Sequence, residues 1–350
     1  MSGAPVIERL SAQGEGDYAA FVAAQGASST YHSLDWRDLL CAVYGYEPCY
    51  LLAREHGIVT GVLPLVSVAI PLRGRHLSGL PFSHRVPLLA TRASREALLA
   101  SARDLATQLR VNYLELREDP ALLGDGDFAP ATGYWQSVLD LQPALEALWR
   151  QVRSSTRRNV ARAERAGVSA RRAAGAEDYR RFYCLMLETR RQQGAPPYPR
   201  EHFERLARLN WARLYVADDA HGVALAGLCI FMHGGQALYA YGASSKRPEH
   251  LEQRPNDLLF WHVIAALRAE GMTALDFGVS PEHLSDLRRY KENWGAVSAR
   301  LHHARWSPSG TPARGVARNG ALAVCATRVI RHTPMSVLAW LGNRFFKYFG

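Results

Sequence analysis

The chain has 350 residues, of which 48% are apolar and 21% are charged, and its net charge is +10. These values predict a globular protein with room for two ordinary domains, and the positive charge favours an anionic partner such as nucleic acid, a phosphorylated ligand or a membrane surface. A soluble basic protein without such a partner would show the same charge. Five scattered cysteines without a CxxC pair argue against a disulfide scaffold or a zinc ribbon.

The stretch MSGAPVIERLSAQGEG at the start has neither a basic segment nor an apolar run, so no secretory signal is expected. No stretch approaches the roughly 20 apolar residues that a membrane-spanning helix needs. Both observations, together with the cysteine pattern, predict a cytoplasmic protein.

The first half of the chain predicts a strand, two helices, two strands, a third helix and a closing strand. Apolar residues recur in these segments with the spacing typical of each element. In order, the predicted segments are strand 6–10, helix 17–24, helix 31–43, strand 49–54, strand 58–68, helix 94–110 and strand 111–117.

A long helix is predicted from Pro143 to Ala166, and its second part is strongly basic. Acidic residues that could pair with these cations at i,i+4 are nearly absent, so the surface suits phosphate groups; a simple solvated helix face is the alternative. The basic residues are Arg150, Arg153, Arg157, Arg158, Arg162 and Arg165, and Glu164 is the single acid among them.

The second half repeats the order of the first. It predicts helix 202–210, strands 213–217, 223–232 and 238–243, a helix from Asn256, and strand 272–277. The His-Gly pairs at His56 and His221 are 165 residues apart, and Leu114 and Leu275 in the closing strands are 161 apart. Two landmarks with nearly the same offset predict the internal duplication of a whole α/β domain.

The last part of this repeat offers places where a ligand could bind. A polar loop at 244–255 leads to Asn256, which is predicted to cap a helix. After the strand at 272–277, Ser280 and Pro281 predict the start of another helix, which carries Lys291. Loops and helix starts at such positions commonly hold ligands.

Several polar residues of this region are candidates for the chemistry. Tyr239 and Tyr241 alternate with apolar residues, which predicts one hydroxyl-bearing face of the strand, although half-buried packing tyrosines would alternate in the same way. Asp276 lies in an apolar strand, where it could act as a base or form an ion pair with Arg288 or Arg289.

Arg254 and Asn256 stand at the predicted helix start, where Arg254 could bind phosphate and Asn256 could cap the helix or contact a ligand. His302 and His303 are adjacent on a predicted strand and would point to opposite faces, so no metal site is predicted.

Five short segments together resemble the Fem-type peptidyltransferases, and most of all the FemAB-related acetyltransferase-like proteins linked to exopolysaccharide systems. The resemblance covers about residues 5 to 305. The segments are Arg158-Asn159, Tyr239–Gly242, Asn256–Trp261, Asp276-Phe277-Gly278 and Tyr290–Gly295. It implies an α/β protein of two tandem GNAT-like domains, each a mixed, mostly antiparallel sheet flanked by helices.

The resemblance also implies an N-acyltransferase or aminoacyl transferase that acts on an amine of a cell-envelope or exopolysaccharide precursor. Lys291 matches the family's lysine at the acyl-donor site, and Tyr241 matches a residue that lines the channel. We therefore expect Lys291, Tyr241 and Asp276 to be catalytic. The expected donor-binding or substrate-binding residues are Arg157, Arg158, Asn159, Arg162, Tyr239, Arg254, Asn256 and Tyr290.

The donor stays open between acyl-CoA and aminoacyl-tRNA, and no tightly bound cofactor is expected. The chain lacks the paired long helices of some Fem ligases, and SSKRPEHLEQRPND stands where acetyltransferases carry a glycine-rich loop. A non-catalytic protein that binds RNA or an anionic membrane is the alternative function.

The predicted domains are 1–142, a basic connecting helix at 143–167, a catalytic domain at 168–306, and a linker with a helical tail at 307–350. The tail mixes aromatic and basic residues. It would therefore either dock on its own domain or contact the inner membrane from the cytoplasmic side.

Overall fold

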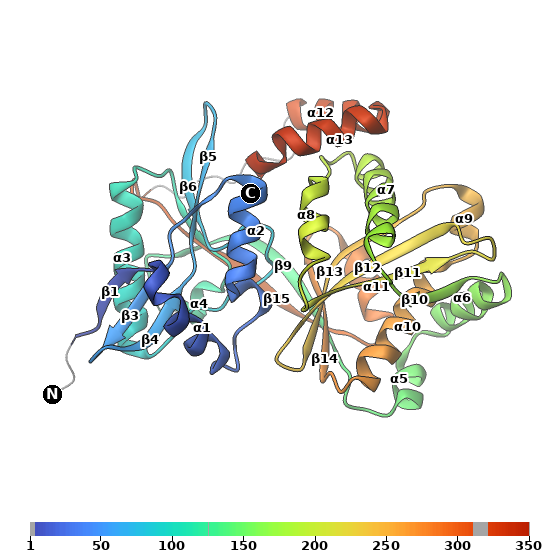
Figure 1. Ribbon diagram of the computed structural model, residues 1–350, viewed down its shortest axis with the longest axis horizontal. Helices are drawn as coiled ribbons and strands as arrows, with labels where there is room; N and C mark the ends of the chain where they lie inside the picture. Colours follow the sequence, from blue (N-terminus) through green and yellow to red (C-terminus); the bar gives the residue numbers. More distant parts are fainter. Residues whose placement is uncertain (1–3, 125, 311–320, 350) are drawn as a thin grey trace. The chain divides into compact units, whose positions relative to one another are not determined.

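The computed structural model describes residues 4–124, 126–310 and 321–349. The chain forms two compact units (Figure 1). Each unit has its own hydrophobic core. Unit 1 comprises Met1–Tyr134, Arg300–Ala317 and Lys347–Gly350, and unit 2 comprises Trp135–Ala299 and Arg318–Phe346.

Unit 1 contains two sheets, with strand orders β1-β3-β4-β7 and β15-β8-β6-β5-β2. Within these two sheets the described strand pairs are antiparallel, except for β6 with β8, which is parallel. The strands are β1 (Val6–Arg9), β2 (Glu47–Pro48), β3 (Leu51–Glu55), β4 (Ile58–Leu63), β5 (Val66–Ile70), β6 (Gly74–Ser78), β7 (Leu89–Ala90), β8 (Leu114–Leu116) and β15 (Val297–Trp306).

The longest helix of unit 1 buries one apolar stripe. In α3, Leu98, Leu99, Ala102 and Leu105 follow the i, i+3, i+4 spacing and lie in the core of this unit. The helices are α1 (Glu15–Ala23), α2 (Leu34–Tyr44), α3 (Arg92–Gln108) and the short α4 (Pro120–Leu123).

Unit 2 is built on the strand order β10-β11-β12-β13-β14-β9. From β10 to β13 neighbouring strands are antiparallel, and β13 pairs with β14 in parallel. The strands are β9 (Ala129–Asp140), β10 (Ser169–Arg172), β11 (Ala212–Asp218), β12 (Ala224–His233), β13 (Gln236–Ser244) and β14 (Ala274–Pro281). The helices are α5 (Leu145–Gln151), α6 (Ser154–Arg165), α7 (Ala176–Gln193), α8 (Arg200–Leu206), α9 (Pro248–Glu252), α10 (Pro255–Ala269) and α11 (Ser285–Glu292).

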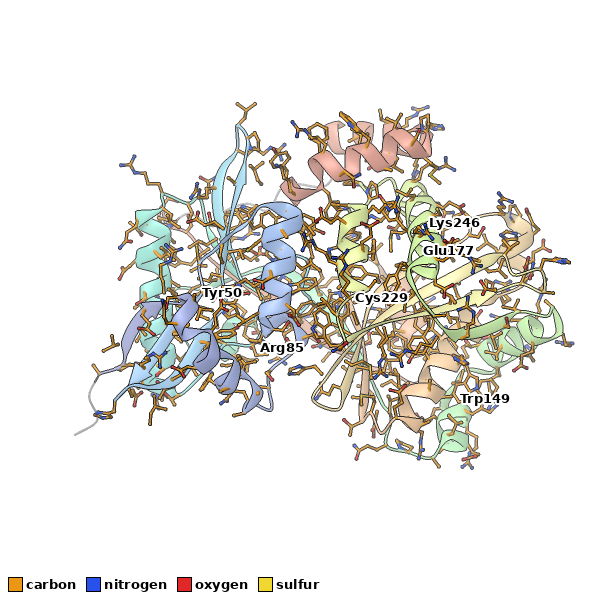
Figure 2. The ribbon with its side chains drawn as sticks, viewed as in Figure 1. Tyr50, Arg85, Trp149, Glu177, Cys229 and Lys246 are labelled. Carbon is orange, nitrogen blue, oxygen red and sulfur yellow. The ribbon has the colours of Figure 1, made fainter. Side chains whose placement is uncertain are left out.

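Strand β12 shows how both faces of this sheet are covered. Leu228 and Ile230 belong to the core that includes Val263 and Ile264 of α10. Gly227 faces Phe182 of α7, and a Cβ at that position would come within 2.5 Å of the ring. Alternate residues of the strand therefore meet helices on opposite faces, and Cys229, labelled in Figure 2, is completely buried between them.

The predicted α/β fold is confirmed, because both units have a mixed, mostly antiparallel sheet flanked by helices. The element order also recurs: His56-Gly57 joins β3 to β4, and His221-Gly222 lies between β11 and β12. A parallel pair follows in both units, β6 with β8 and β13 with β14. This recurrence agrees with the predicted duplication.

The single connecting helix predicted over 143–167 is wrong in detail. The structure has α5 and α6, separated by Val152 and Arg153, whose backbones are extended. Val152 is 2% exposed, and the Arg153 amide donates to the carbonyl of Asn293. The break turns Val152 into the core while the arginines of α6 remain outside.

Two predicted helix starts are also wrong. Helix α10 begins at Pro255 with Arg254 as its N-cap, so Asn256 is the second helical residue. Strand β14 continues through Ser280 to Pro281, and α11 begins only at Ser285. Pro255 is therefore the first residue of α10, and Pro281 is the last residue of β14.

The tail forms α12 (Ala321–His332) and α13 (Met335–Phe345), and both pack against α7. The predicted linker after Gly310 lies largely outside the described residues. Within the described part of the chain, no helix combines the length and hydropathy that crossing a bilayer requires.

Candidate functional site

The candidate site lies where the parallel strands β13 and β14 separate. Their ladder joins Gln236 with Ala274 and ends at the pairing of Leu238 with Asp276. Beyond this point the described residues of the two strands are no longer paired with each other, although both strands continue for several residues. Side chains and backbone groups of Tyr239 onward and of Asp276 onward therefore become available to a ligand or to neighbouring helices.

Lys291 of α11 reaches into this region. It is 3% exposed, and its Nζ donates to the carbonyl oxygen of Gly278 in β14 at 2.8 Å. Burial lowers the pKa of Lys291 to about 8, and the negative charge of Asp276 opposes that shift. An ammonium group has three N–H donors, and this hydrogen bond uses one of them. Lys291 is thus a buried cation and not a surface lysine.

Asp276 is held beside the same turn. One carboxylate oxygen accepts from the Gly278 amide at 2.7 Å, and the other accepts from Nε2 of Gln136 at 2.6 Å. Gly278 has φ of 69°, a left-handed conformation that glycine adopts without cost. This conformation lets one residue bond both side chains, through its amide to Asp276 and through its carbonyl to Lys291.

Arg288 and Arg289 form their ion pairs with residues other than Asp276. Arg288 pairs with Glu292 at 3.3 Å and also lies over the ring of Trp135, while Arg289 pairs with Asp286 at 3.6 Å. The predicted alternative of an ion pair between Asp276 and one of these arginines thus finds no support in their geometry.

Four of the expected binding residues lie near one another on the α10 face of the sheet. They are Asn159, Tyr239, Arg254 and Tyr290. The rings of Tyr239 and Tyr290 lie 5.1 Å and 5.9 Å from that of Phe260. Burial raises the pKa of Asp257 to about 6, against the opposing effects of the Arg254 charge and a hydrogen bond from Asn159. Burial, followed by the charge of Asp257, raises the pKa of Tyr290.

Tyr241 lies on the other face of the sheet, which corrects the predicted hydroxyl-bearing face. The ladder pairs Cys229 with Tyr241 and Ile230 with Tyr239, so Ala240 is an extra, unpaired residue. Such a β-bulge inverts the alternation. The Tyr241 hydroxyl lies 3.0 Å from Nε2 of His202 in α8, and burial lowers the pKa of this histidine to about 3.

The basic surface predicted for donor phosphates is present on α6. Arg158, Arg162 and Arg165 are exposed, and Arg157 is half-buried, with a 3.5 Å contact to the Trp149 carbonyl. Within the described part of the chain, none of these four arginines forms an ion pair with a carboxylate. Helix α6 packs on α10 and supplies Asn159 to Asp257 near the start of that helix.

Arg254 precedes α10 in an unusual conformation. Its φ of 57° is left-handed, a region in which a residue with a side chain is strained. Its side chain is exposed, and its charge acts on Asp257 at the first turn of α10. Asn256 is half-buried beside it.

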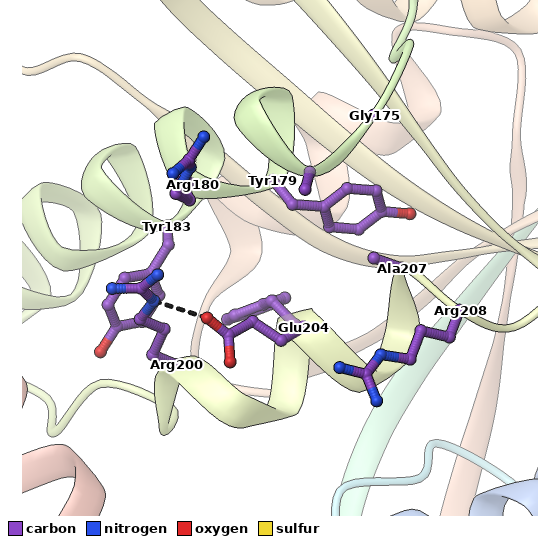
Figure 3. A pocket seen from close by; sticks show the side chains of 10 residues that line it. Gly175, Tyr179, Arg180, Tyr183, Arg200, Glu204, Ala207 and Arg208 are labelled. Carbon is purple, nitrogen blue, oxygen red and sulfur yellow. Dashed lines mark hydrogen bonds and ion pairs between the residues drawn. The ribbon is translucent and has the colours of Figure 1, made fainter.

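A cavity of about 510 Å³ lies between α7 and α8, away from the strand opening. Tyr179 and Arg208 line it, and Arg200 at its rim bonds Glu204 at 2.7 Å (Figure 3). Phe203 also lines it and contacts the ring of Tyr241 at 5.4 Å. The cavity is basic and partly aromatic.

Of the three residues expected to be catalytic, the structure brings Lys291 and Asp276 together around Gly278, while Tyr241 lies on the opposite face. Sequence reasoning missed Gln136, His202 and Asp257. Gln136 and His202 gave no local signal, because their partners are far along the chain. Asp257 could have been noticed as a carboxylate followed by the apolar run Leu258 to Trp261.

Comparisons with known proteins agree with the observed fold. Residues 150–292 match the model of the acetyltransferase (GNAT) domain. Comparison with the curated proteins gives no significant match.

Solved structures show the same fold. The crystal structure of FemX has a TM-score of 0.67 at 16% identity, covering 86% of this chain and 97% of the other. The C-terminal domain of a lysylphosphatidylglycerol synthetase from Agrobacterium fabrum has a TM-score of 0.55 at 14% identity, with 91% and 97% covered. A tandem GNAT protein from the clavulanic acid biosynthesis pathway has a TM-score of 0.54 at 15% identity, with 88% and 99% covered.

Residues 150–292 match the acetyltransferase (GNAT) domain, and the fold of the chain is similar to those of FemX and of a tandem GNAT protein, which agrees with the resemblance noted in the sequence. The chain has the fold of two tandem GNAT-like domains. The link to exopolysaccharide systems stays a prediction.

Proposed function

We propose that the protein transfers an acyl or aminoacyl group to an amine, and that the reaction takes place where β13 and β14 separate. The observation that carries the proposal is the buried ammonium group of Lys291 at this opening, within the segment that matches the acetyltransferase domain. A cation is costly to bury, so its position beside a strand opening favours a functional role.

In this reaction the amine nitrogen attacks the carbonyl carbon of the donor, and a tetrahedral oxyanion forms. Collapse of the intermediate breaks the bond to the leaving group, a thiol for acyl-CoA or a ribose hydroxyl for aminoacyl-tRNA. The proton lost by the amine passes to that leaving group. Lys291 would stabilise the oxyanion with its remaining N–H donors, and Asp276 would keep the lysine charged and oriented.

The phosphates of the donor would bind at the start of α10 and along α6. Arg158 and Arg162 are exposed, and no described carboxylate pairs with them; Arg254, the N-cap of α10, is also exposed. Arginine binds phosphate through several parallel hydrogen bonds. Both acyl-CoA and aminoacyl-tRNA carry phosphates, so this surface serves either donor, while the acetyltransferase domain match favours acyl-CoA.

The acceptor that we propose is an amine of a cell-envelope or exopolysaccharide precursor, reached in the cytoplasm at the inner membrane. The structural relatives include a lysylphosphatidylglycerol synthetase, whose name points to a membrane acceptor for that protein. This likeness supports the acceptor class proposed here and no particular compound.

The test compares wild-type protein with Lys291→Met and Lys291→Arg in mixtures of acetyl-CoA or charged tRNA with a lipid-linked amino-sugar precursor. Wild type should give the mass shift of the transferred group. Loss of one oxyanion donor typically costs about 10²–10³ in rate, so Lys291→Met should lose at least that, and Lys291→Arg should keep part of the activity.

The matched control is Arg289→Met, which removes an exposed cation from the same helix and should leave transfer unchanged. Equal rates in wild type and Lys291→Met would remove Lys291 from the mechanism. No transfer by wild type from either donor would contradict the proposed reaction for these substrates.

A second candidate function is non-catalytic binding of RNA, which the exposed arginines of α6 favour. Such binding should weaken steeply with salt, with a slope set by the number of phosphate contacts. A short single-stranded RNA titrated at several salt concentrations tests this candidate. Tight, salt-sensitive binding by a protein without transferase activity would support it over the enzyme.

A further inference from the structure

The C-terminal helix α13 has two apolar sides, and only one of them is covered. Leu338 and Gly342 are buried on the side that faces α7. Val337, Trp340 and Arg344 follow one another at helical spacing on the other side, where Val337 is 45% exposed and Trp340 is 59% exposed.

Contacts of the inner side, which faces α7, fix the orientation of the helix. A Cβ at Gly342 would come within 2.6 Å of the Pro197 carbonyl, so only glycine permits this close approach. The amide of Arg200 donates to Oδ1 of Asn343 at 3.1 Å. Phe346 is 3% exposed, and its ring lies 4.4 Å from that of Tyr198. Docking on the same unit thus explains the inner side and leaves Trp340 uncovered.

Charge along the tail has one sign only. From residue 321 to the end the sequence contains no aspartate or glutamate, while Arg328, Arg331, Arg344 and Lys347 are cationic. The side chains of Arg328, Arg331 and Arg344 are exposed. A basic surface that also exposes a tryptophan and a valine is complementary to the anionic headgroups and upper acyl chains of a bilayer.

We propose that the outer side of α13, formed by Val337, Trp340 and Arg344, docks the protein on an anionic lipid bilayer. The helix has 11 residues, so it would lie in the plane of the headgroups and not cross the membrane. RNA would use the arginines but not Val337, and the exposed apolar residues therefore favour lipid. The inference rests on the proposed function only in one respect, namely that a bilayer would present the acceptor.

The experiment measures co-sedimentation of the full chain with phosphatidylcholine vesicles, with and without phosphatidylglycerol. Wild type should bind the phosphatidylglycerol vesicles and lose most of this binding at high salt. The double variant Val337→Ser/Trp340→Ser should bind at least roughly tenfold more weakly, because it removes the apolar groups that insert. Arg344→Gln should weaken binding mainly at low salt.

Leu72→Ser is the matched control, because Leu72 is a fully exposed leucine in unit 1 and its loss should leave vesicle binding unchanged. Lys291→Met should also bind vesicles like wild type, so failure of the transferase proposal would not affect this result. Equal binding by wild type and Val337→Ser/Trp340→Ser, or equal binding to vesicles without phosphatidylglycerol, would overturn the inference. Binding of RNA without binding of vesicles would overturn it as well.

Discussion

At the scale of single residues, Lys291 is the most unusual group in unit 2. Its ammonium group is almost completely buried, with one hydrogen bond to Gly278 and the charge of Asp276 nearby. Removing a charge from water costs several kcal/mol, and one neutral carbonyl returns only part of that cost. The site therefore destabilises the fold at neutral pH, as expected for a lysine retained for function.

This burial predicts how stability depends on pH. The pKa of Lys291 falls from 10.5 to about 8 on folding, so between about pH 8 and pH 10.5 the unfolded chain holds a proton that the folded chain has lost. Stability of wild type relative to Lys291→Met should therefore rise with pH across this range, by up to roughly 3 kcal/mol. Urea denaturation of both proteins at about pH 7 and about pH 10 measures the difference. A difference that stays constant with pH would show that Lys291 is not buried as a cation.

Arg254 shows strain of a different kind. A glycine at φ of 57° would avoid the steric cost that an arginine has there. Among the described residues, the exposed side chain of Arg254 forms no hydrogen bond or ion pair that would offset this cost. We interpret the residue as one kept for its charge at the start of α10, which agrees with the proposed phosphate site.

At the scale of elements, the bulge in β13 decides which groups share a face. The extra residue Ala240 sends Tyr239 towards Phe260 and Tyr241 towards His202. Gly242 then leaves room for the hydroxyl of Tyr239, which lies where a Cβ at position 242 would be. The strand thus combines a bulge and a glycine to hold one tyrosine flat along its surface.

Gly242→Ala tests this arrangement. The added methyl group would overlap the Tyr239 hydroxyl, and overpacking of this kind typically costs about 1–3 kcal/mol of unfolding free energy. Tyr239→Phe/Gly242→Ala should recover part of the loss, because phenylalanine lacks the overlapping oxygen. Urea denaturation of the two single variants and the double variant gives the coupling energy.

Gly175→Ala is the control for this series, since a Cβ there meets nothing within 4 Å and the backbone is extended. It should change stability little. Additive effects of Tyr239→Phe and Gly242→Ala would contradict the proposed contact.

The sequence predicted the elements well where periodicity alone determines them. The strands around His221, the strand before His56 and the helix at 94–110 lie close to their predicted positions, whereas the single strand predicted over 58–68 is divided at Pro64 and Leu65 into β4 and β5. It failed where a single residue interrupts a pattern: the bulge at Ala240 and the extended pair Val152-Arg153 carry no local signal, since tertiary packing produces both.

The same limit applies to the candidate site. Lys291 and Asp276 were predicted separately, but their meeting at Gly278 depends on how α11 folds back on β14. The partner of Asp276, Gln136, is 140 residues away along the chain. Such long-range pairs follow from topology, which one sequence does not show.

At the scale of the whole molecule, the chain consists of two units with separate cores, and the same order of elements recurs in both. The acetyltransferase domain match covers residues 150–292, within unit 2, and the proposed site lies there too. Unit 1 repeats the architecture of unit 2. Two separate cores imply that each unit has its own stability, since cooperativity follows the packing within a core.

Leu77→Ala and Leu259→Ala test this division. Both leucines are completely buried, Leu77 in the core of unit 1 and Leu259 in that of unit 2. Each substitution should cost about 2–5 kcal/mol. Differential scanning calorimetry of wild type should resolve two transitions, of which Leu77→Ala lowers one and Leu259→Ala lowers the other. A single transition that both variants lower equally would mean that the duplicated units unfold as one cooperative body, and the stability of the proposed site would then depend on the core of unit 1 as much as on its own.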